Sequence, residues 1–337
     1  MSYQVTLKPS NHQFTVDADE TILDAALRQG FNLNYGCRNG ACGSCMGKLL
    51  DGSVTYGDHP RGALDEDDEA DGQALFCQAM PSSDLTIEAN EIGAVKDVVI
   101  KTLPCKVQAL ERLNHDVMLV KLKPPMTERM RFLAGQYIDF LLKDGRRRSF
   151  SIANAPHEDE FIELHIRHID GGRFTSEVFD EMHEKDLVRI QGPLGGFFLR
   201  EDSTRPIIFM VGGTGFGPVK GIIEHALAMK MERPMHLYWG ARAKEDLYME
   251  EQVKEWTRQN PLIRFTPVLS EAKENDEWQG RTGYVHEAIA EDYDDLSKHE
   301  IYASGRPEMV YAGKDVFEKQ GLDLQHYFSD AFEYQKD

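Results

Sequence analysis

The hydrophobic pattern changes twice along the chain, and each change marks a predicted domain boundary. In the first part, apolar residues alternate over residues 3–7 and 14–16, which predicts strands. Residues 21–29 have the apolar spacing of a helix, with Asp19 as a plausible N-cap and Gly30 as its end. We therefore expect a small mixed fold of the β-grasp kind in this region.

From residue 103 the pattern becomes a series of short alternating runs separated by turn residues, which predicts an antiparallel barrel. These runs span residues 105–110, 117–122, 137–142 and 161–166. From about residue 204, nearly continuous apolar strands alternate with helices, a pattern typical of a parallel sheet covered by helices on both faces. The fold class is thus a multidomain chain of α+β, β and α/β parts. The predicted domains are 1–93, a linker 94–102, 103–201 and 202–337.

Composition narrows the classes of protein that fit. The 337 residues are 41% apolar and 28% charged, which excludes a disordered or collagen-like chain. No apolar stretch approaches the roughly 18 residues of a membrane helix, and MSYQVTLKPS has no basic segment before an apolar one. We expect a cytoplasmic protein, monomeric in isolation. The net charge of −19 repels nucleic acid and anionic lipid and is compatible with a basic protein partner.

The cysteine spacing is the most specific signal in the sequence. Cys37-x4-Cys42-x2-Cys45, with Cys77 further on, matches the plant-type [2Fe–2S] pattern. A structural zinc site usually pairs two C-x2-C knuckles, whereas this chain has only one. The spacing therefore favours a cluster over zinc or four reduced thiols, and residues 1–93 resemble a plant-type ferredoxin. Cys105 stands alone and is expected to be a small buried residue.

A second motif lies in the predicted barrel. Arg148-Ser149-Phe150-Ser151 resembles the R-x-[YF]-S motif of the ferredoxin–NADP reductase superfamily. The resemblance implies that the arginine pairs with the FAD pyrophosphate, that the aromatic ring packs on the isoalloxazine, and that Ser151 hydrogen-bonds the N5 edge. Phe150 keeps the stacking face of the commoner tyrosine and lacks its hydroxyl.

Two further segments resemble the same family in the expected order. The second flavin segment of the family is a strand, a Gly-rich turn and a helix whose N-terminal amides bind phosphate. The matching residues here are Arg167, His168, Ile169, Gly172, Arg173, Phe174 and Thr175. Residues 192–198, Gly-Pro-Leu-Gly-Gly-Phe-Phe, resemble the closing motif of the barrel. We expect His168 to line the flavin and His165 to be a strand residue without a catalytic role.

A Gly-rich turn between a strand and a helix opens the last domain. It resembles the G-G-T-G-x-x-P turn of the family through Gly213, Thr214, Gly215 and Pro218, although it lacks the GxGxxG fingerprint. Further on, Asp246 (or Glu245) could accept hydrogen bonds from both adenosine ribose hydroxyls, which favours NADH, whereas Arg242 favours NADPH. We expect NADH, with NADPH possible. These acids could instead be ordinary helix N-terminal residues.

The C-terminal region supplies the last resemblance. Ser304-Gly305-Arg306 begins a segment that resembles the C-G-x-P-x-M turn beside the nicotinamide, with serine in place of cysteine. Phe332 matches the terminal aromatic residue that covers the flavin in the family. The resemblance implies that Ser151, Ser304 and Phe332 are the catalytic residues.

Taken together, the motifs resemble the [2Fe–2S] ferredoxin–FAD–NAD(P)H reductases of oxygenases, most of all the CDP-6-deoxy-Δ3,4-glucoseen reductase-like branch. The resemblance implies that FAD takes an electron pair from NADH and releases single electrons through the cluster to a partner metalloenzyme, either an oxygenase or a sugar dehydratase. One alternative is a free-standing flavin or quinone reductase, whose activity would survive deletion of residues 1–93. Another is a non-enzymatic cluster carrier, whose C-terminal domains sense nucleotides and which would not turn over NADH.

Residues 65–71 form a strongly acidic run between the third and fourth cluster cysteines. A run of this kind is often a solvated loop. Because it lies close in sequence to Cys77, it could instead guide a basic acceptor toward the cluster.

Overall fold

The computed structural model describes residues 1–89, 91–92, 98–273 and 277–332. The chain divides into two compact units, Met1–Val98 and Val99–Asp337. Of the predicted linker, residues 94–97 lie outside the described residues, and its last two residues begin the first strand of the second unit. The barrel and the nicotinamide domain, predicted separately, belong to one unit.

The first unit is built on a five-stranded sheet in the order β2-β1-β7-β3-β5. β1 pairs in parallel with β7, and the other neighbours are antiparallel, which is the mixed arrangement expected for a β-grasp domain. The strands are β1 (Ser2–Lys8), β2 (His12–Asp17), β3 (Met46–Asp51), β5 (Gln73–Leu75) and β7 (Leu85–Glu88), with a second small sheet of β4 (Val54–Thr55) and β6 (Met80–Pro81).

Helix α1 (Ile22–Arg28) packs its apolar face, including Ile22 and Leu23, into the core of this unit. Its N-cap is Thr21, whose hydroxyl accepts a hydrogen bond from the N–H of Asp24 at 3.1 Å. The prediction of Asp19 as N-cap was wrong. The helix begins at Ile22, so Thr21 is the flanking residue, and its side chain reaches a free N–H of the first turn.

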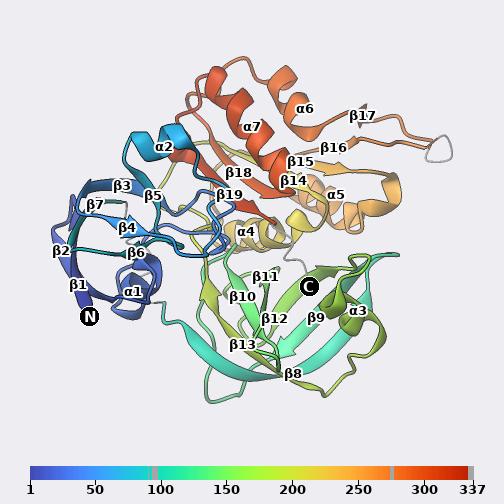
Figure 1. The fold of residues 1–337 in the computed structure, drawn as a ribbon. Helices are drawn as coiled ribbons and strands as arrows, with labels where there is room; N and C mark the ends of the chain where they lie inside the picture. Colours follow the sequence, from blue (N-terminus) through green and yellow to red (C-terminus); the bar gives the residue numbers. More distant parts are fainter. Residues whose placement is uncertain (90, 93–97, 274–276, 333–337) are drawn as a thin grey trace. The chain divides into compact units, whose positions relative to one another are not determined.

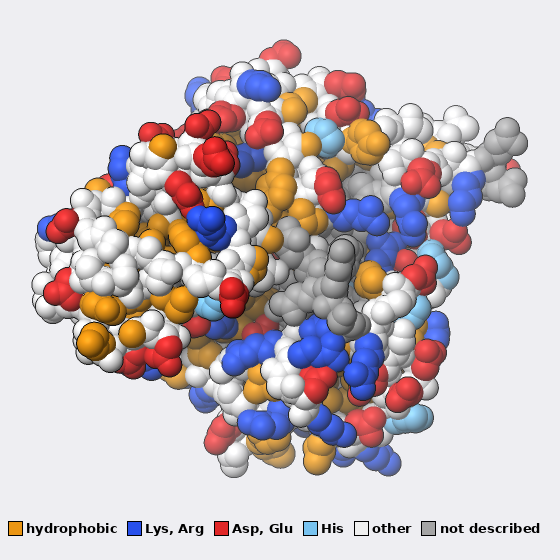
Figure 2. Space-filling model, viewed as in Figure 1, with side chains coloured by type: hydrophobic (Ala, Val, Ile, Leu, Met, Phe, Trp, Pro, Cys, Tyr) orange, Lys and Arg blue, Asp and Glu red, His pale blue; other side chains and the backbone are white. Residues whose placement is uncertain are grey.

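The acidic run folds into a short helix, α2 (Glu66–Ala70), instead of remaining a loop. Asp65 caps it by accepting from the N–H of Asp68 at 2.8 Å, and the acidic first turn is favourable at the positive end of a helix dipole. None of its residues is buried, and Figure 2 shows acidic side chains gathered on the surface over this helix.

The barrel in the second unit is a six-stranded antiparallel sheet in the order β11-β10-β13-β8-β9-β12. An isolated bridge between Ile152 and Leu164 joins its two outer strands. Its elements are β8 (Lys101–Arg112), β9 (Val117–Lys123), β10 (Tyr137–Leu141), β11 (Arg147–Ser151), β12 (Ile162–Arg167), helix α3 (Arg173–Asp180) and β13 (Leu187–Leu194). Leucine, isoleucine, valine and phenylalanine side chains fill its interior.

The nicotinamide domain is a parallel sheet in the order β17-β16-β15-β14-β18-β19, with helices α4 and α5 on one face and α6 and α7 on the other (Figure 1). The strands are β14 (Ile207–Gly212), β15 (Met235–Ala241), β16 (Ile263–Leu269), β17 (Arg281–Thr282), β18 (Glu300–Gly305) and β19 (Tyr327–Ala331). The helices are α4 (Phe216–Ala228), α5 (Glu250–Gln259), α6 (Val285–Asp292) and α7 (Pro307–Lys319), with 3-10 turns η2 (Gly213–Gly215), η3 (Lys244–Asp246) and η5 (Leu324–His326).

Helix α3 starts at Arg173, immediately after the Gly-rich turn. Residues 244–246 form a separate 3-10 turn before α5, which starts at Glu250. Among the described residues, no helix is long and apolar enough to cross a membrane.

Candidate functional site

Three of the four predicted cluster ligands lie in the loop between α1 and β3, and the fourth follows β5. The N–H of Cys37 donates to Sγ of Cys42, and the N–H of Cys42 donates to Sγ of Cys37, each at 3.3 Å. The loop turns at Gly40, where φ is +79° and an added Cβ would lie 2.2 Å from the carbonyl oxygen of Pro60. Only glycine fits this position.

The four sulfur atoms influence one another in two pairs. The hydrogen bond between the thiols of Cys37 and Cys42 raises the pKa of Cys37 and lowers the pKa of Cys42 to about 6. The thiol of Cys77 likewise raises the pKa of Cys45, and its own pKa is lowered. All four are free cysteines. Four neighbouring thiols held by one tight loop and one distant residue fit a [2Fe–2S] cluster.

The first flavin motif lies on β11. Phe150 is half-buried, and its ring centroid lies 5.7 Å from that of Phe140 and 5.6 Å from that of Phe174. Ser149 donates from Oγ to Oδ1 of the buried Asp139 at 2.6 Å. The motif is therefore fixed to the barrel by packing on one side and by a charge-assisted hydrogen bond on the other.

The second flavin segment forms the turn before α3. Thr175 Oγ1 accepts from the N–H of Ile169 and donates to the carbonyl of Gly172, each at 3.1 Å. No side chain caps the N-terminus of α3 at Gly172, so the first amides of this helix remain suited to phosphate oxygens. Arg173 is exposed in the first turn of α3, and Arg148 Nη1, on β11, donates to the carbonyl of its neighbour Arg147 at 2.9 Å. These groups fit the pyrophosphate of FAD.

His168 and Phe174 take structural positions in the same segment. His168 Nε2 lies 3.3 Å from Ser176 Oγ. Phe174 is buried in the barrel core, and its ring packs against the ring of Phe150. His165, expected to be a strand residue without a catalytic role, is buried, and its Nδ1 lies 3.0 Å from the hydroxyl of Tyr248.

The Gly-rich turn joins β14 to α4. Its 3-10 turn and the following helix carry no side-chain cap, which leaves their N-terminal amides available to a phosphate. An added Cβ at Gly215 would lie 2.1 Å from the carbonyl oxygen of Ser304, so the close approach of this turn to β18 requires glycine. Thr214 is half-buried, and Pro218 is buried within the first turn of α4. This geometry fits a dinucleotide pyrophosphate.

The two C-terminal segments meet in neighbouring strands. In the pairing of β18 with β19, Ser304 lies opposite Asp330, and the N–H of Phe332 donates to the carbonyl of Gly305 at 2.8 Å. Ser304 is fully buried, and its hydroxyl has no hydrogen-bond partner among the described residues. A buried hydroxyl of this kind is suited to a polar group of a bound ligand. Arg306 is exposed as the N-cap of α7.

Asp330 is a functional candidate that the sequence reasoning missed. Its Oδ2 accepts a hydrogen bond from Ser151 Oγ at 2.8 Å, although the two residues are 179 positions apart. The contact brings the barrel motif and the terminal strand together at one point. The only sequence signal was an acid two residues before Phe332, which had no meaning until its partner was known.

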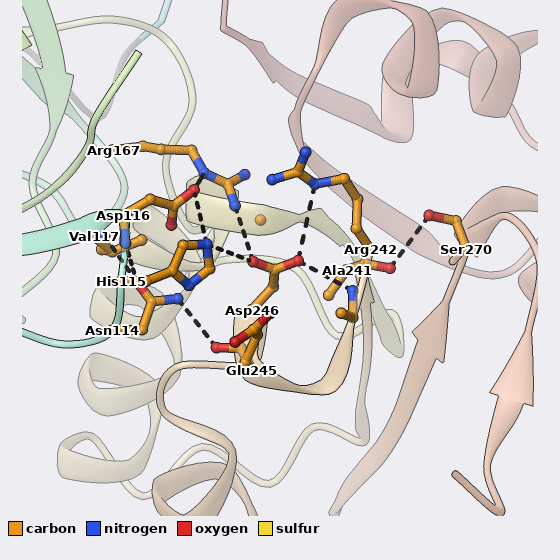
Figure 3. A network of polar contacts seen from close by, with 12 residues as sticks. Asn114, His115, Asp116, Val117, Arg167, Ala241, Arg242, Glu245, Asp246 and Ser270 are labelled. Atoms are coloured by element: carbon orange, nitrogen blue, oxygen red, sulfur yellow. Dashed lines mark hydrogen bonds and ion pairs between the residues drawn. The ribbon is translucent and has the colours of Figure 1, made fainter. Parts of the chain in front are cut away.

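The residues predicted to choose between NADH and NADPH lie after β15 and are Arg242 and Asp246, with Glu245 as the alternative to Asp246 (Figure 3). Arg242 is exposed, and its Nε lies 3.9 Å from Asp246 Oδ2. Asp246 is buried, and its carboxylate accepts from the N–H of Ala243 and faces Arg167 of the barrel. The ribose contact of Asp246 stays a prediction, and the geometry points to another role, discussed below.

Three protein-family models match the chain in order. They are the 2Fe-2S iron-sulfur cluster binding domain at residues 5–82, the oxidoreductase FAD-binding domain at 104–199 and the oxidoreductase NAD-binding domain at 209–315. The chain is also 40% identical over 332 residues to the CDP-6-deoxy-L-threo-D-glycero-4-hexulose-3-dehydrase reductase of Yersinia pestis, covering 98% of this chain and 99% of that protein. It belongs to the [2Fe–2S] ferredoxin-reductase family.

Two further similar proteins are also named as reductases. It is 33% identical over 334 residues to the terephthalate 1,2-dioxygenase reductase component 1 of a Comamonas species, covering 98% of each chain. The crystal structure of the Amycolatopsis cytochrome P450 reductase GcoB matches with a TM-score of 0.82 at 31% identity, covering 98% of each chain. These findings confirm an oxidoreductase that binds a [2Fe–2S] cluster, FAD and NAD and transfers electrons to a partner enzyme. The predicted fold class and cofactors are confirmed with it.

Proposed function

We propose that this reductase draws electrons from NADH, with NADPH a poorer donor, and delivers them one at a time to a terminal acceptor protein. The observation that carries the proposal is the meeting of Ser151, Ser304, Asp330 and Phe332, which come from three separate segments, beside a Gly-rich turn with uncapped amides. When bound, FAD supplies the exchange between a two-electron hydride and single electrons, and the cluster supplies a one-electron exit.

The four cysteines Cys37, Cys42, Cys45 and Cys77 are proposed to hold the cluster. For FAD, we propose that Arg148, Arg173 and the amides after Gly172 bind the pyrophosphate and that Phe150 packs on the ring system. Thr175 and Ile169 keep the turn in place through their hydrogen bond. Arg167 is the last residue of β12, and His168 follows it in the same segment.

For the nicotinamide, Gly213, Thr214, Gly215 and Pro218 are proposed to receive the pyrophosphate, with Gly305 and Arg306 beside the reactive ring. Ser304 offers at this place a hydroxyl that has no hydrogen-bond partner in the described part of the chain. Ser151 is held by Asp330 in an orientation that presents its oxygen to the flavin edge. Phe332, tied to Gly305 through its N–H, covers the site until the nicotinamide displaces its ring. Arg242 remains the proposed contact for the adenosine end.

The acceptor is proposed to be a dehydratase that acts on a nucleotide-linked deoxyhexulose, because the relative with that printed name shares 40% identity. An oxygenase component is the second candidate, supported by the terephthalate relative at 33% identity. We also propose that the reductase acts as a monomer in the cytoplasm, whose reducing conditions suit five free cysteines. The predicted boundaries 1–93, 94–102, 103–201 and 202–337 are kept as part of this proposal.

Anaerobic titration of the purified protein tests the proposal. We expect about two irons, two acid-labile sulfides and one FAD per chain. NADH should bleach the flavin and the cluster with three electrons in total, and a purified dehydratase or oxygenase should then reoxidise them. Zinc in place of iron, or a flavin that NADH leaves oxidised, would contradict the proposal. Acceptor turnover that survives deletion of residues 1–93 would instead support a free-standing flavin reductase.

A further inference from the structure

A group of polar residues joins the barrel to the nicotinamide domain beside the Gly-rich turn (Figure 3). We call this group the clasp. On the barrel it consists of Asn114, His115, Asp116 and Arg167, and on the nicotinamide domain of Glu245 and Asp246. The first three lie at the turn between β8 and β9, and Arg167 is the last residue of β12.

Arg167 is the centre of the clasp. Its Nε donates to Asp116 Oδ2 at 2.7 Å within the barrel, and its Nη2 donates to Asp246 Oδ1 at 3.4 Å across to the nicotinamide domain. His115 Nε2 lies 3.7 Å from the same Oδ1. A planar guanidinium can bridge two carboxylates in this way, whereas the ammonium of a lysine cannot hold the same fixed geometry.

Asp246 is built into the clasp on its other side as well. Its Oδ2 accepts from the N–H of Ala243 at 3.1 Å, which closes the turn η3, and the residue is only 4% exposed. Asn114 Nδ2 donates to the carbonyl of Glu245 at 3.1 Å, so the barrel holds the turn by its backbone too. Both oxygens of the Asp246 carboxylate already have partners in the protein. The carboxylate therefore has little hydrogen-bonding capacity left for a ribose.

The position of the clasp relates it to the chemistry. An added Cβ at Gly213 would lie 2.8 Å from Arg167 Nη1, so the bridging guanidinium touches the Gly-rich turn itself. The clasp therefore fixes the turn η3 and the Gly-rich turn relative to the barrel that carries the flavin motif. Hydride transfer requires the donor carbon of the nicotinamide and the acceptor nitrogen of the flavin at close range, so a small misplacement of one domain lowers the rate.

We propose that Asp246 is a positioning residue, which acts through Arg167 and His115 to hold the nicotinamide domain in register with the flavin barrel, and that it is not the ribose acceptor. The proposal rests on the proposed function, since it assigns a part in the same hydride transfer. It separates the two roles that the sequence left open for this carboxylate.

The test is anaerobic stopped-flow reduction of the flavin by NADH and by NADPH in the full-length holoprotein. Asp246→Asn keeps an acceptor for the Ala243 N–H and removes the charge that pairs with Arg167. We expect the limiting rate of flavin reduction to fall about tenfold, with the ratio of NADH to NADPH efficiency unchanged within about twofold. Glu251→Gln, which removes an exposed acid paired with Lys254 inside one domain, is the matched control and should change neither value.

The double variant that combines Asp246→Asn with Arg167→Gln provides a second measurement. Because both changes break one bridge, we expect its limiting rate to be no lower than that of the slower single variant. A raised KM for NADH, an altered ratio and an unchanged limiting rate in Asp246→Asn would overturn the proposal in favour of ribose binding. Strictly additive losses would overturn it as well.

Should Asp246→Asn fail to retain flavin, His115→Ala serves in its place. This residue is about half exposed and contacts Asp246 from outside, so its loss should leave the fold intact. We expect a two- to threefold lower limiting rate with the nucleotide ratio unchanged, and no change in rate would overturn the proposal. Failure of the proposed function is distinguishable, because wild-type flavin would then remain oxidised with NADH before any variant is compared.

Discussion

The two units of this reductase arrange their charges in opposite ways. Among the described residues of Met1–Val98, no charged side chain is buried, and the buried polar side chains are the uncharged Thr21 and Gln78. In Val99–Asp337 buried charges are frequent, among them Glu163, Lys220 and Asp246. Isolated charges are costly to bury, so each of these requires a partner. In the second unit, changing one of these charges therefore leaves a buried partner unpaired, whereas the site residues built into the core of the first unit are the predicted ligands Cys45 and Cys77.

One group of buried charges in the second unit lies where the barrel meets the nicotinamide domain. Lys220 Nζ on α4 lies 3.1 Å from Glu163 Oε1 on β12 and 2.9 Å from Glu224 Oε2. Burial disfavours the charged ammonium, but the two carboxylates raise the pKa of Lys220 above its usual value. Burial alone would raise the pKa of Glu163, but His165 and Lys220 lower it to about 2.

The largest expected effect tests the independence of the first unit. Cys42→Ser should abolish NADH-dependent reduction of cytochrome c, because one cluster ligand is lost. NADH–ferricyanide turnover should remain, since ferricyanide can take electrons from the flavin. The ratio of the two activities in wild type and variant checks this expectation. The far-ultraviolet circular dichroism spectra of the two proteins show whether the fold is kept. Equal loss of both activities would mean that the two units do not function separately.

The next effect tests the dependence of the second unit on paired charge. Lys220→Met leaves Glu163 buried with weaker partners, and we expect a loss of roughly 3–5 kcal/mol in the free energy of unfolding. That corresponds to a decrease of about 10 °C in the melting temperature. The melting temperature is measured from the rise in flavin fluorescence as the protein unfolds and releases its flavin. Adding Glu163→Gln should restore part of this loss, because it removes the unpaired charge. A single variant as stable as wild type would show that the pair contributes nothing.

A smaller effect is the loss of folding stability of the second unit at low pH. Because the pKa of Glu163 is about 2 in the folded state and 4.5 otherwise, its stabilisation is present above pH 4.5 and is lost as the pH falls toward 2. This stabilisation amounts to about 3 kcal/mol in the free energy of unfolding. Burial lowers the pKa of His165, which adds acid sensitivity of the same sign, whereas burial raises the pKa of Glu224, which opposes it.

Comparison with Glu163→Gln isolates this contribution. The difference in melting temperature between wild type and variant should be largest near neutral pH and should narrow toward about pH 3. A gap that stays constant over this range would show that Glu163 does not titrate as proposed. Among its described residues the first unit has no buried carboxylate, so no group of this kind contributes to its acid sensitivity.

The smallest effect concerns the acidic helix of the first unit. Changing Asp67, Asp68 and Glu69 to the amides should slow reduction of a basic acceptor about tenfold at low salt and flatten its salt dependence. A control that neutralises Asp17, Asp19 and Asp51, which are exposed elsewhere on the unit, should have less effect. NADH–ferricyanide turnover should not change in either. Unchanged rate and salt slope in the first variant would leave α2 as a solvated helix without a docking role.

Local features were predictable from the sequence because they depend on neighbouring residues. The cysteine spacing, the Gly-rich turns and the order of strands and helices all follow from short-range geometry and periodicity, and the family comparisons confirm the cofactors they imply. The N-cap of α1 was predicted wrongly, because a single hydrogen bond decides between nearby residues at the end of a helix.

The sequence by itself determined which cofactors this protein binds and in which order their domains follow. Only the tertiary structure decided what individual charges do. Asp246 reads as a ribose acceptor by position, yet folding buries it against Arg167 of the barrel, 79 positions away. Ser151 acquires Asp330 in the same manner, through the pairing of β19 with β18. A side chain's partners depend on which distant strands pack together, and no local pattern of residues contains that information.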